Sequence, residues 1–393
     1  MMGLKIPKRK CHLLVDSDAQ RGMSLVELLV AIVISMVVSL AVYGVLATSE
    51  GKKRTTTSLS DIQQSGVYVT YLLERSIRSA GAGFSAIAPS SFGCLLNAAN
   101  SGTKIFPAPS YSLPPPFDGL LAAIGGSFRM APVIIVNGIG AHHSDALIVM
   151  AGDSGLSGIG TSMSNLPAST ELTMKNVASF KGGDIVAIVD PAGTSSGSCL
   201  ISQVNATFVP IAGASSLPLA GKYYTASGES KQLAEYSIAA NVISLGAHPV
   251  MDIITVGSSN TLFRYDAFQG GAAVEPIAEG VHMLYAYYGV DVDGDPVTTD
   301  IEWINPAEDA AYSAPSLLDG SLSANTKISN IRAIRVGVVM KSSLPEKEIV
   351  SPENISLFAD TGKPLEIELT ERNYRYRVFE ITIPLRNLLL ATA

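Results

Sequence analysis

The feature that most constrains this chain is a glutamate, Glu27, at the start of an uncharged apolar segment, residues 28–49. In a helix, twenty-two residues at about 1.5 Å each extend over about 33 Å, enough to cross the hydrocarbon core of a bilayer. A charge within such a helix costs roughly 2.5–3.5 kcal/mol on insertion scales, and charged groups kept there usually have a partner. The segment therefore predicts a membrane helix whose first turn carries a paired carboxylate.

The charges on either side of this segment predict its orientation. Five Lys and Arg residues precede it, whereas three, Lys52, Lys53 and Arg54, follow it closely. The positive-inside rule then places the N-terminus in the cytoplasm and the rest of the chain in the periplasm.

An ordinary secretory signal peptide is the main alternative for this segment. Its apolar region usually has about 7–15 residues, and its cleavage site follows that region. Here the apolar region is longer, and the conspicuous glycine, Gly22, precedes it. A plain membrane anchor is a second alternative, but it explains neither Gly22 nor Glu27.

The composition suggests one large or two ordinary domains rich in turns. The chain has 393 residues, of which 47% are hydrophobic and 16% charged, with 35 glycines and 21 prolines. The formal net charge is −7, but the residues before Met23 carry five cations and two aspartates. The remainder is therefore still more acidic, and an acidic body without a long basic run argues against nucleic-acid binding.

The segment 21–30 reads RGMSLVELLV and resembles the class III signal of type IV prepilins and type II secretion pseudopilins. The resemblance implies that a prepilin peptidase cleaves after Gly22 on the cytoplasmic side and that the new N-terminus, Met23, is methylated. It also implies that Glu27 is the buried glutamate of a filament core. Many major pilins begin the mature chain with phenylalanine, whereas this chain has methionine.

A filament core gives the Glu27 carboxylate a reason to be kept. A charge buried among apolar helices must be paired or neutralised. The amino group of Met23 in a neighbouring subunit can supply the opposite charge, and such a pair would also set the register between subunits. We expect Glu27 to fix the docking of this subunit in a helical stack.

The three cysteines are Cys11, Cys94 and Cys199. If the chain is cut after Gly22, Cys11 leaves with the leader and two remain. A Cys94–Cys199 disulfide would suit an oxidising compartment, and closing a loop of about 100 residues is worth up to about 4.7 kcal/mol in the chain-entropy model. Two buried free thiols are the alternative.

A long helix, about residues 24–79, is allowed because no proline occurs between Pro7 and Pro89. Gly44 and Gly51 are weak points in it, each costing about 1 kcal/mol relative to alanine. Its second half carries an amphipathic stripe at three- and four-residue spacing, which we expect to pack on a sheet. The stripe consists of Leu59, Ile62, Gly66, Val69, Leu73 and Ile77.

Beyond the helix the pattern predicts strands joined by long loops. Residues 84–132 are rich in Ser, Ala, Gly and Pro, and we expect loops there with few regular elements. Residues 331–340 form a near-continuous apolar run, and the alternating residues 281–287 and 375–383 are expected to be further core strands of a mostly antiparallel sheet. Shorter apolar runs predict additional strands at 132–136, 145–150, 184–189, 203–209 and 250–256.

Four further segments resemble PilW-type minor pilins: the helix end LERSIRSAG, residues 279–291, IRAIRV at 331–336, and the stretch from YRYRVF at 374–379 to Leu385-Arg386-Asn387. The resemblance implies an α+β, type IV pilin-like fold, with a long N-terminal helix packed on an antiparallel β-sheet with large loop insertions. The implied domains are a cleaved leader (1–22), a transmembrane and filament-core helix (23–49), an amphipathic continuation of the stem (50–83) and a periplasmic β-rich domain (84–393).

The same resemblance implies a non-enzymatic subunit that helps to initiate type IV pilus assembly. It would lie at or near the pilus tip, support twitching motility and adhesion, and contact the major pilin, other minor pilins and a PilY-type adhesin. It would begin as a single-pass protein of the bacterial inner membrane. The tip pseudopilin of a type II secretion system is the alternative, and a membrane-tethered periplasmic enzyme or binding module is the contrasting class.

No HExxH, GxSxG or P-loop pattern occurs in the sequence. His142 and His143 stand beside Asp145, but adjacent strand residues point to opposite faces, which favours a surface loop over a metal site. The best metal candidate is a calcium site at Asp291, Asp293 and Asp295, because clustered carboxylates supply hard oxygen ligands. An acidic hairpin turn is the alternative, since Asp-Gly favours tight turns. We expect no other cofactor.

Overall fold

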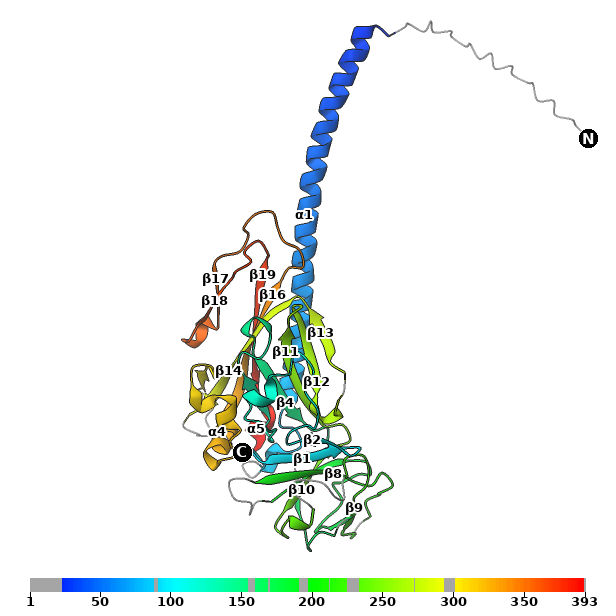
Figure 1. Ribbon diagram of the computed structural model, residues 1–393, viewed down its shortest axis with the longest axis vertical. Helices are drawn as coiled ribbons and strands as arrows, with labels where there is room; N and C mark the ends of the chain where they lie inside the picture. Colours follow the sequence, from blue (N-terminus) through cyan, green and yellow to red (C-terminus); the bar gives the residue numbers. More distant parts are fainter. Residues whose placement is uncertain are drawn as a thin grey trace, which may run out of the picture. The chain divides into compact units, whose positions relative to one another are not determined.

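The chain divides into two compact units, Met1–Thr57 and Ser58–Ala393, and helix α1 (Leu25–Ser79) contributes residues to both. The ribbon is shown in Figure 1. The computed structural model describes residues 23–87, 91–154, 160–168, 170–190, 197–211, 213–224, 233–271, 273–292 and 301–391.

In the first unit, α1 is one uninterrupted apolar helix that begins within one residue of the position expected from the sequence. Among the described residues, α1 is the one helix that is long and apolar enough to cross a membrane. No part of its most apolar stretch is buried within the protein. The sequence expectation of a spanning helix is therefore met in length and composition.

In the second unit, the C-terminal part of α1 buries most of the predicted stripe, whereas Leu59 is only half-buried. Ile62, Val69, Leu73 and Ile77 are at most 4% exposed, and burying each such side chain contributes about 1.5–3 kcal/mol relative to an exposed position. The helix ends before Gly81, whose positive φ of 78° suits glycine. The amide of Gly81 donates to the carbonyl of Met150, 2.9 Å away, so the helix end is attached to a sheet.

A four-stranded antiparallel sheet lies against this part of the helix, in the strand order β15-β14-β16-β19. Leu284, Ala286, Val336 and Val338 face the main core together with the α1 stripe, and all three predicted core strands are present. The strands are β14 (Val281–Asp291), β15 (Ile301–Ile304), β16 (Ile331–Lys341) and β19 (Tyr376–Pro384).

A β-hairpin covers the other face of this sheet. It consists of β17 (Asn354–Leu357) and β18 (Leu365–Glu368). Leu357 and Phe358 pack with Tyr287 and Val339 in a separate small core. Alternation along β14 and β16 thus supplies two apolar faces, one for the helix and one for the hairpin.

A second, five-stranded antiparallel sheet has the order β13-β12-β11-β4-β3. It confirms the strands predicted at 132–136, 145–150 and 250–256. Its strands are β3 (Val133–Val136), β4 (Ala146–Ala151), β11 (Val250–Gly257), β12 (Thr261–Asp266) and β13 (Glu275–Glu279).

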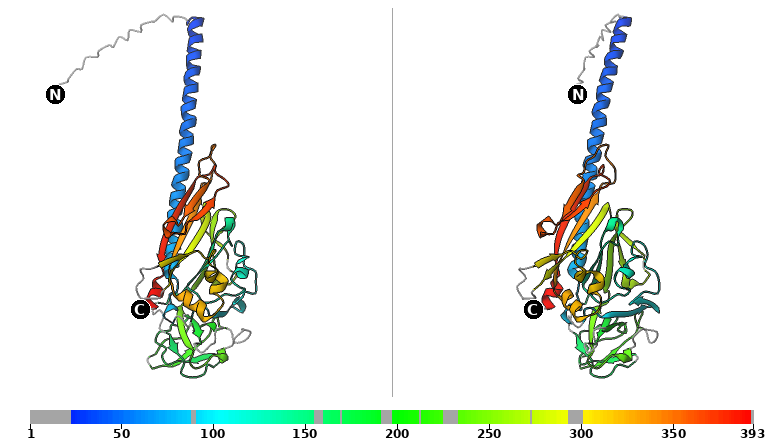
Figure 2. Two further views of the ribbon diagram at one scale, coloured as in Figure 1. Left: turned by 90° about the vertical axis from the view of Figure 1, so that its left-hand side faces the viewer. Right: turned by 60° about the vertical axis from the view of Figure 1, so that its left-hand side comes forward.

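A six-stranded sheet, β2-β1-β8-β7-β10-β5, lies at the opposite end of the second unit from the β17–β18 hairpin (Figures 1 and 2). Its β1–β8 pair is parallel and the other pairs are antiparallel. A two-stranded sheet, β6 (Glu171–Thr173) with β9 (Ser216–Pro218), adds to a second core there. The six strands are β1 (Leu95–Asn100), β2 (Thr103–Phe106), β5 (Thr161–Ser162), β7 (Ile185–Val189), β8 (Ser198–Gln203) and β10 (Asn241–Gly246).

Two expectations for the middle of the chain need correction. The strand expected at 203–209 is wrong: β8 ends at Gln203, and Asn205 turns the chain by accepting the amide of Thr207 at 2.9 Å. The segment 84–132, expected to have few regular elements, includes the β1–β2 hairpin. The remaining α-helices are α2 (Leu120–Ala123), α3 (Ala314–Leu317), α4 (Leu322–Ser329) and α5 (Arg386–Ala391).

Candidate functional site

The N-terminus of α1 has the arrangement of a capped helix. The hydroxyl of Ser24 accepts the amide of Glu27 at 3.2 Å, and the carbonyl of Ser24 accepts the amide of Leu28 at 3.1 Å. The sequence Ser-x-x-Glu is that of a capping box, and a carboxylate is favoured at the positive end of a helix dipole. Glu27 therefore lies in the first turn, four residues from Met23. Gly22 lies outside the described residues.

The side chains of α1 that follow Glu27 are exposed in the isolated chain. The large hydrophobic residues from Leu25 to Leu46 range from 49% exposed at Leu28 to 77% at Leu25. So large an apolar surface on one helix requires lipid or other subunits around it.

The hydroxyl groups of this helix are satisfied within it. Ser35 donates to the carbonyl of Ile32 at 2.8 Å, and Ser39 donates to that of Ser35 at 2.7 Å. Thr48 donates to the carbonyl of Val45 at 2.9 Å. Because these polar groups need no water, the helix suits an apolar environment.

A disulfide joins Cys94 and Cys199, whose Cα atoms are 5.6 Å apart. Cys199 lies in β8 and Cys94 directly precedes β1, so the bond links the two parallel neighbours of the six-stranded sheet. Both residues are buried. The pair expected from the sequence is thus present, and Cys11 lies outside the described residues.

The candidate calcium loop falls mostly outside the described part of the chain. Asp293 and Asp295 are not described, whereas Asp291 ends β14 and is 2% exposed. Its Oδ2 accepts from Nε and Nη2 of Arg332 at 3.1 and 3.0 Å. Asp291 therefore already has a cationic partner. Within the described ranges no three His, Cys, Asp or Glu residues are grouped so that they could hold a metal ion.

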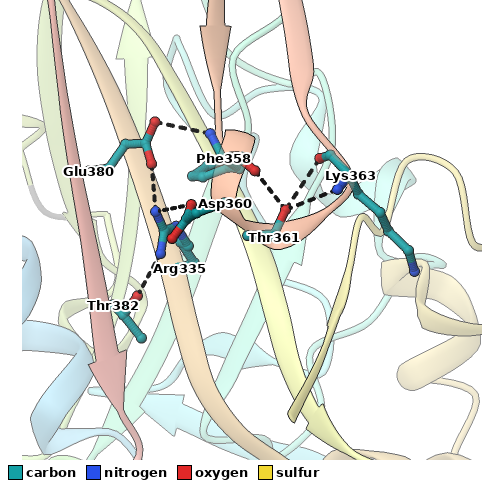
Figure 3. A network of polar contacts seen from close by, with 7 residues as sticks. All are labelled: Arg335, Phe358, Asp360, Thr361, Lys363, Glu380 and Thr382. Atoms are coloured by element: carbon teal, nitrogen blue, oxygen red, sulfur yellow. Dashed lines mark hydrogen bonds and ion pairs between the residues drawn. The ribbon is translucent and has the colours of Figure 1, made fainter.

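Arg335 is the centre of a polar network that attaches the β17–β18 hairpin to the sheet (Figure 3). Its Nη2 lies 2.7 Å from Oε2 of Glu380 and 2.6 Å from Oδ1 of Asp360. The other oxygen of Glu380 accepts the amide of Phe358 at 2.9 Å, and the Phe358 ring centroid lies 4.4 Å from that of Tyr287. The network therefore joins β16, β19 and the turn after β17.

His142 and His143 lie in an exposed turn, where a loop was expected, but His142 has a distant partner. Its ring centroid lies 4.1 Å from that of His282 on β14. His282 is buried, and its Nδ1 lies 2.7 Å from Oδ1 of Asn260. Burial, and then the nearby His142 and Lys341, lower the pKa of His282 to about 4. It is therefore neutral at pH 7.

Asp145, which stood beside the histidine pair in the sequence, is a buried link between two sheets. Its Oδ2 accepts the amide of Ala286 on β14 at 3.0 Å, and its Oδ1 accepts from Nδ2 of Asn137 at 3.2 Å. Burial raises the pKa of Asp145 to about 7, although these hydrogen bonds oppose the rise. We assign it a structural role.

A groove of about 570 Å³ lies in the second unit between α1 and the strands β11 to β13. Tyr68 and Arg75 line it from the helix, and Asp252, Arg264 and Glu275 from the strands. Arg264 forms ion pairs with Glu275 at 2.5 Å and Asp252 at 3.9 Å. The charged groups of the strand wall are therefore paired with one another.

Two family models match the chain. The prokaryotic N-terminal methylation motif matches residues 17–43, which include Gly22, Met23 and Glu27. This match defines the class: a protein with a prepilin-type signal followed by an apolar helix. The family Type IV Pilus-assembly protein W, PilW, matches residues 253–387, which run from β11 to the start of α5. No curated protein and no solved structure matches the chain.

The PilW match covers three of the four segments that resemble PilW-type minor pilins, and the helix end at residues 73–81 lies outside both matches. The segments 279–291, 331–336 and 374–387 all fall within the PilW region, while residues 44–252 are matched by neither family. The two matches support a role in type IV pilus assembly, with other pilus components and the prepilin peptidase as interaction partners. The motif and the exposed apolar helix fit a single-pass protein of the inner membrane.

Proposed function

We propose that this chain is a non-enzymatic minor pilin that helps to initiate type IV pilus assembly and lies at or near the pilus tip. The observation that carries the proposal is the combination of a methylation motif on an exposed apolar helix with the large unit Ser58–Ala393. A body of this size suits a rare subunit at one end of the fibre better than one repeated along it. At the tip it would support adhesion and twitching motility, and it could carry a PilY-type adhesin.

The proposed sequence of events begins at the inner membrane, with the N-terminus cytoplasmic and the body periplasmic. Prepilin peptidase cleaves after Gly22, which leaves the amino group of Met23 at the start of the helix and available for methylation. The helix then leaves the bilayer for the filament core, where other helices replace lipid around its apolar side chains. The Glu27 carboxylate is compensated there by the N-terminal amino group of a neighbouring pilin.

The role of Glu27 is tested by substitution in cells that make the pilus. Glu27→Ala should be processed at Gly22 but should enter the sheared pilus fraction poorly. Without the carboxylate, the positive charge of the neighbouring pilin's N-terminal amino group would remain unpaired in an apolar core. Glu27→Asp is the matched control and should retain part of the incorporation. Incorporation of Glu27→Ala at the wild-type level would refute this role.

The tip pseudopilin of a type II secretion system is the second candidate, because the N-terminal signal resembles those of both systems. The PilW match favours the pilus. Deletion of the gene should abolish twitching motility and leave the release of secreted proteins unchanged. The opposite phenotype would favour the secretion system.

A further inference from the structure

The outer edge of β19 is a long, regular sheet edge without a partner. β19 pairs with β16 over nine consecutive residues without a bulge. In the described part of the chain no strand pairs with its other side. Natural proteins usually protect such edges with proline, bulges, short strands, charged side chains or covering segments.

The other edges of the two long antiparallel sheets carry such protection. β13 contains Pro276 and its pairing with β12 is interrupted by a bulge. β15 has four residues, and all four residues of β3 are buried. β19 has neither a proline in its interior nor a bulge, and its charged residues are Arg377 and Glu380.

Three apolar side chains of β19 are incompletely buried. Val378 faces the hairpin core, and Phe379 and Ile381 face the main core, but all three are only half-buried. A strand added at this edge would cover them on both faces of the sheet.

The charge of Arg377 is also unmatched. Lys341 and Arg335 on β16 and Arg375 just before β19 form ion pairs with Glu371, Glu380 and Glu346 respectively. Arg377 is exposed, and no ion pair or hydrogen bond involves its side chain within the described ranges.

We propose that the edge of β19 binds an extended segment of another pilus subunit as an added β-strand. The segment would place an Asp or Glu opposite Arg377 and apolar residues opposite Phe379 and Ile381, which share one face of the sheet with Arg377. Main-chain hydrogen bonds would give the binding energy, and the carboxylate would set the register. This inference rests on the proposed role in pilus assembly.

Pairing with β19 of a second copy of this chain does not meet these requirements. The face of β19 that carries Arg377 has Phe379, Ile381 and Ile383, and none of these is acidic. Glu380 lies on the opposite face and already binds Arg335 and the amide of Phe358. A β19–β19 pair would therefore leave Arg377 unmatched.

Site-specific photo-cross-linking in pilus-forming cells tests the proposal on the full chain. A benzophenone amino acid replaces Tyr376, an aromatic neighbour of Arg377 on the same strand. The control places it at Glu279, an exposed residue of the β13 edge. The Tyr376 position should form an adduct with another pilus subunit, through a segment that contains an acidic residue, and the Glu279 position should form none.

Charge variants then test the role of Arg377. Arg377→Lys should keep the adduct, whereas Arg377→Glu should reduce it about tenfold, which corresponds to about 1.4 kcal/mol. Replacing the partner's acidic residue with lysine should restore the adduct to Arg377→Glu. An unchanged yield in Arg377→Glu, a failed restoration, or an adduct with a second copy of this chain would overturn the proposal.

N-terminal sequencing of the same samples separates this proposal from the proposed function. If the chains begin at Met23 and the adduct is absent, the edge proposal fails while pilin processing stands. If the leader is intact in the wild-type protein, the proposed function itself fails.

Discussion

Gly66 of α1 lies directly against the ring of Phe379 on β19. A Cβ atom at Gly66 would fall 2.2 Å from Cε2 of Phe379, too close for any real contact. The glycine thus allows the amphipathic part of the helix to approach the sheet at this point. Its place in the stripe of buried residues is explained by this close approach, which outweighs the cost of a glycine within a helix.

Replacing Gly66 with alanine should destabilise the second unit. Alanine gains up to about 1 kcal/mol of helix propensity, but forcing a methyl group into the Phe379 ring costs about 1–3 kcal/mol. We expect a net loss of about 1 kcal/mol in chemical denaturation of the detergent-solubilised chain. In a Phe379→Ala background the same change should stabilise, because the ring is gone. Equal effects in both backgrounds would show that the contact is unimportant.

Stability should fall as pH rises from about 4 to about 7 because of Asp145. Its pKa is raised from an ordinary value of 3.8 to about 7, so between these values the folded state binds more protons than the unfolded state. The contribution of Asp145 to the free energy of unfolding is fully present below about pH 4 and is lost as pH rises through 7. Asp145→Asn should reduce this part of the pH dependence, measured as the urea midpoint at pH 5 and pH 7.5. Identical pH dependence in both proteins would contradict the assignment.

Removing the disulfide should cost about 2–5 kcal/mol of stability, as is usual for native disulfides. Cys94→Ser with Cys199→Ser should therefore lower the denaturation midpoint strongly. Cys11→Ser is the matched control and should have no effect on the mature protein, because the proposed cleavage after Gly22 removes Cys11. Thiol labelling should find no free cysteine before reduction and two after it. Two reactive thiols in the unreduced, denatured mature protein would rule out the bond.

The two carboxylates bound to Arg335 should contribute unequally. The Asp360 side chain is 66% exposed and that of Glu380 is 23% exposed. An exposed ion pair is worth about 0–1 kcal/mol, whereas Glu380 also holds the amide of Phe358. Glu380→Gln should therefore loosen the β17–β18 hairpin, seen as faster hydrogen exchange there, and Asp360→Asn should have little effect. A larger effect of Asp360→Asn than of Glu380→Gln would contradict the greater contribution assigned to Glu380.

The elements that could be predicted from the sequence are those with a strong local pattern. The stripe from Ile62 to Ile77 repeats at helical spacing, and β14, β16 and β19 are long runs of alternating or continuous apolar residues. The disulfide followed from counting cysteines once the leader was set aside. The N-terminal signal was recognisable because its glycine, glutamate and apolar helix are adjacent in sequence.

The features that sequence reasoning missed depend on residues brought together by the fold. β1 has the sequence LLNAAN, which lacks β-branched residues and becomes a strand through its neighbours. Arg332 meets Asp291 because β16 pairs antiparallel with β14, and His142 meets His282 because the turn before β4 lies against β14. The strand expected at 203–209 failed because Asn205 favours a turn over extended pairing.

Processing and assembly of this chain as a pilin are tested by mass spectrometry of its N-terminal peptide, recovered from sheared pili. We expect a chain that begins at Met23, carries a methyl group on its α-amino nitrogen and lacks the first 22 residues. A chain recovered with its leader intact, or cleaved after the apolar segment as in an ordinary signal peptide, would contradict the proposal that it is processed and assembled as a pilin.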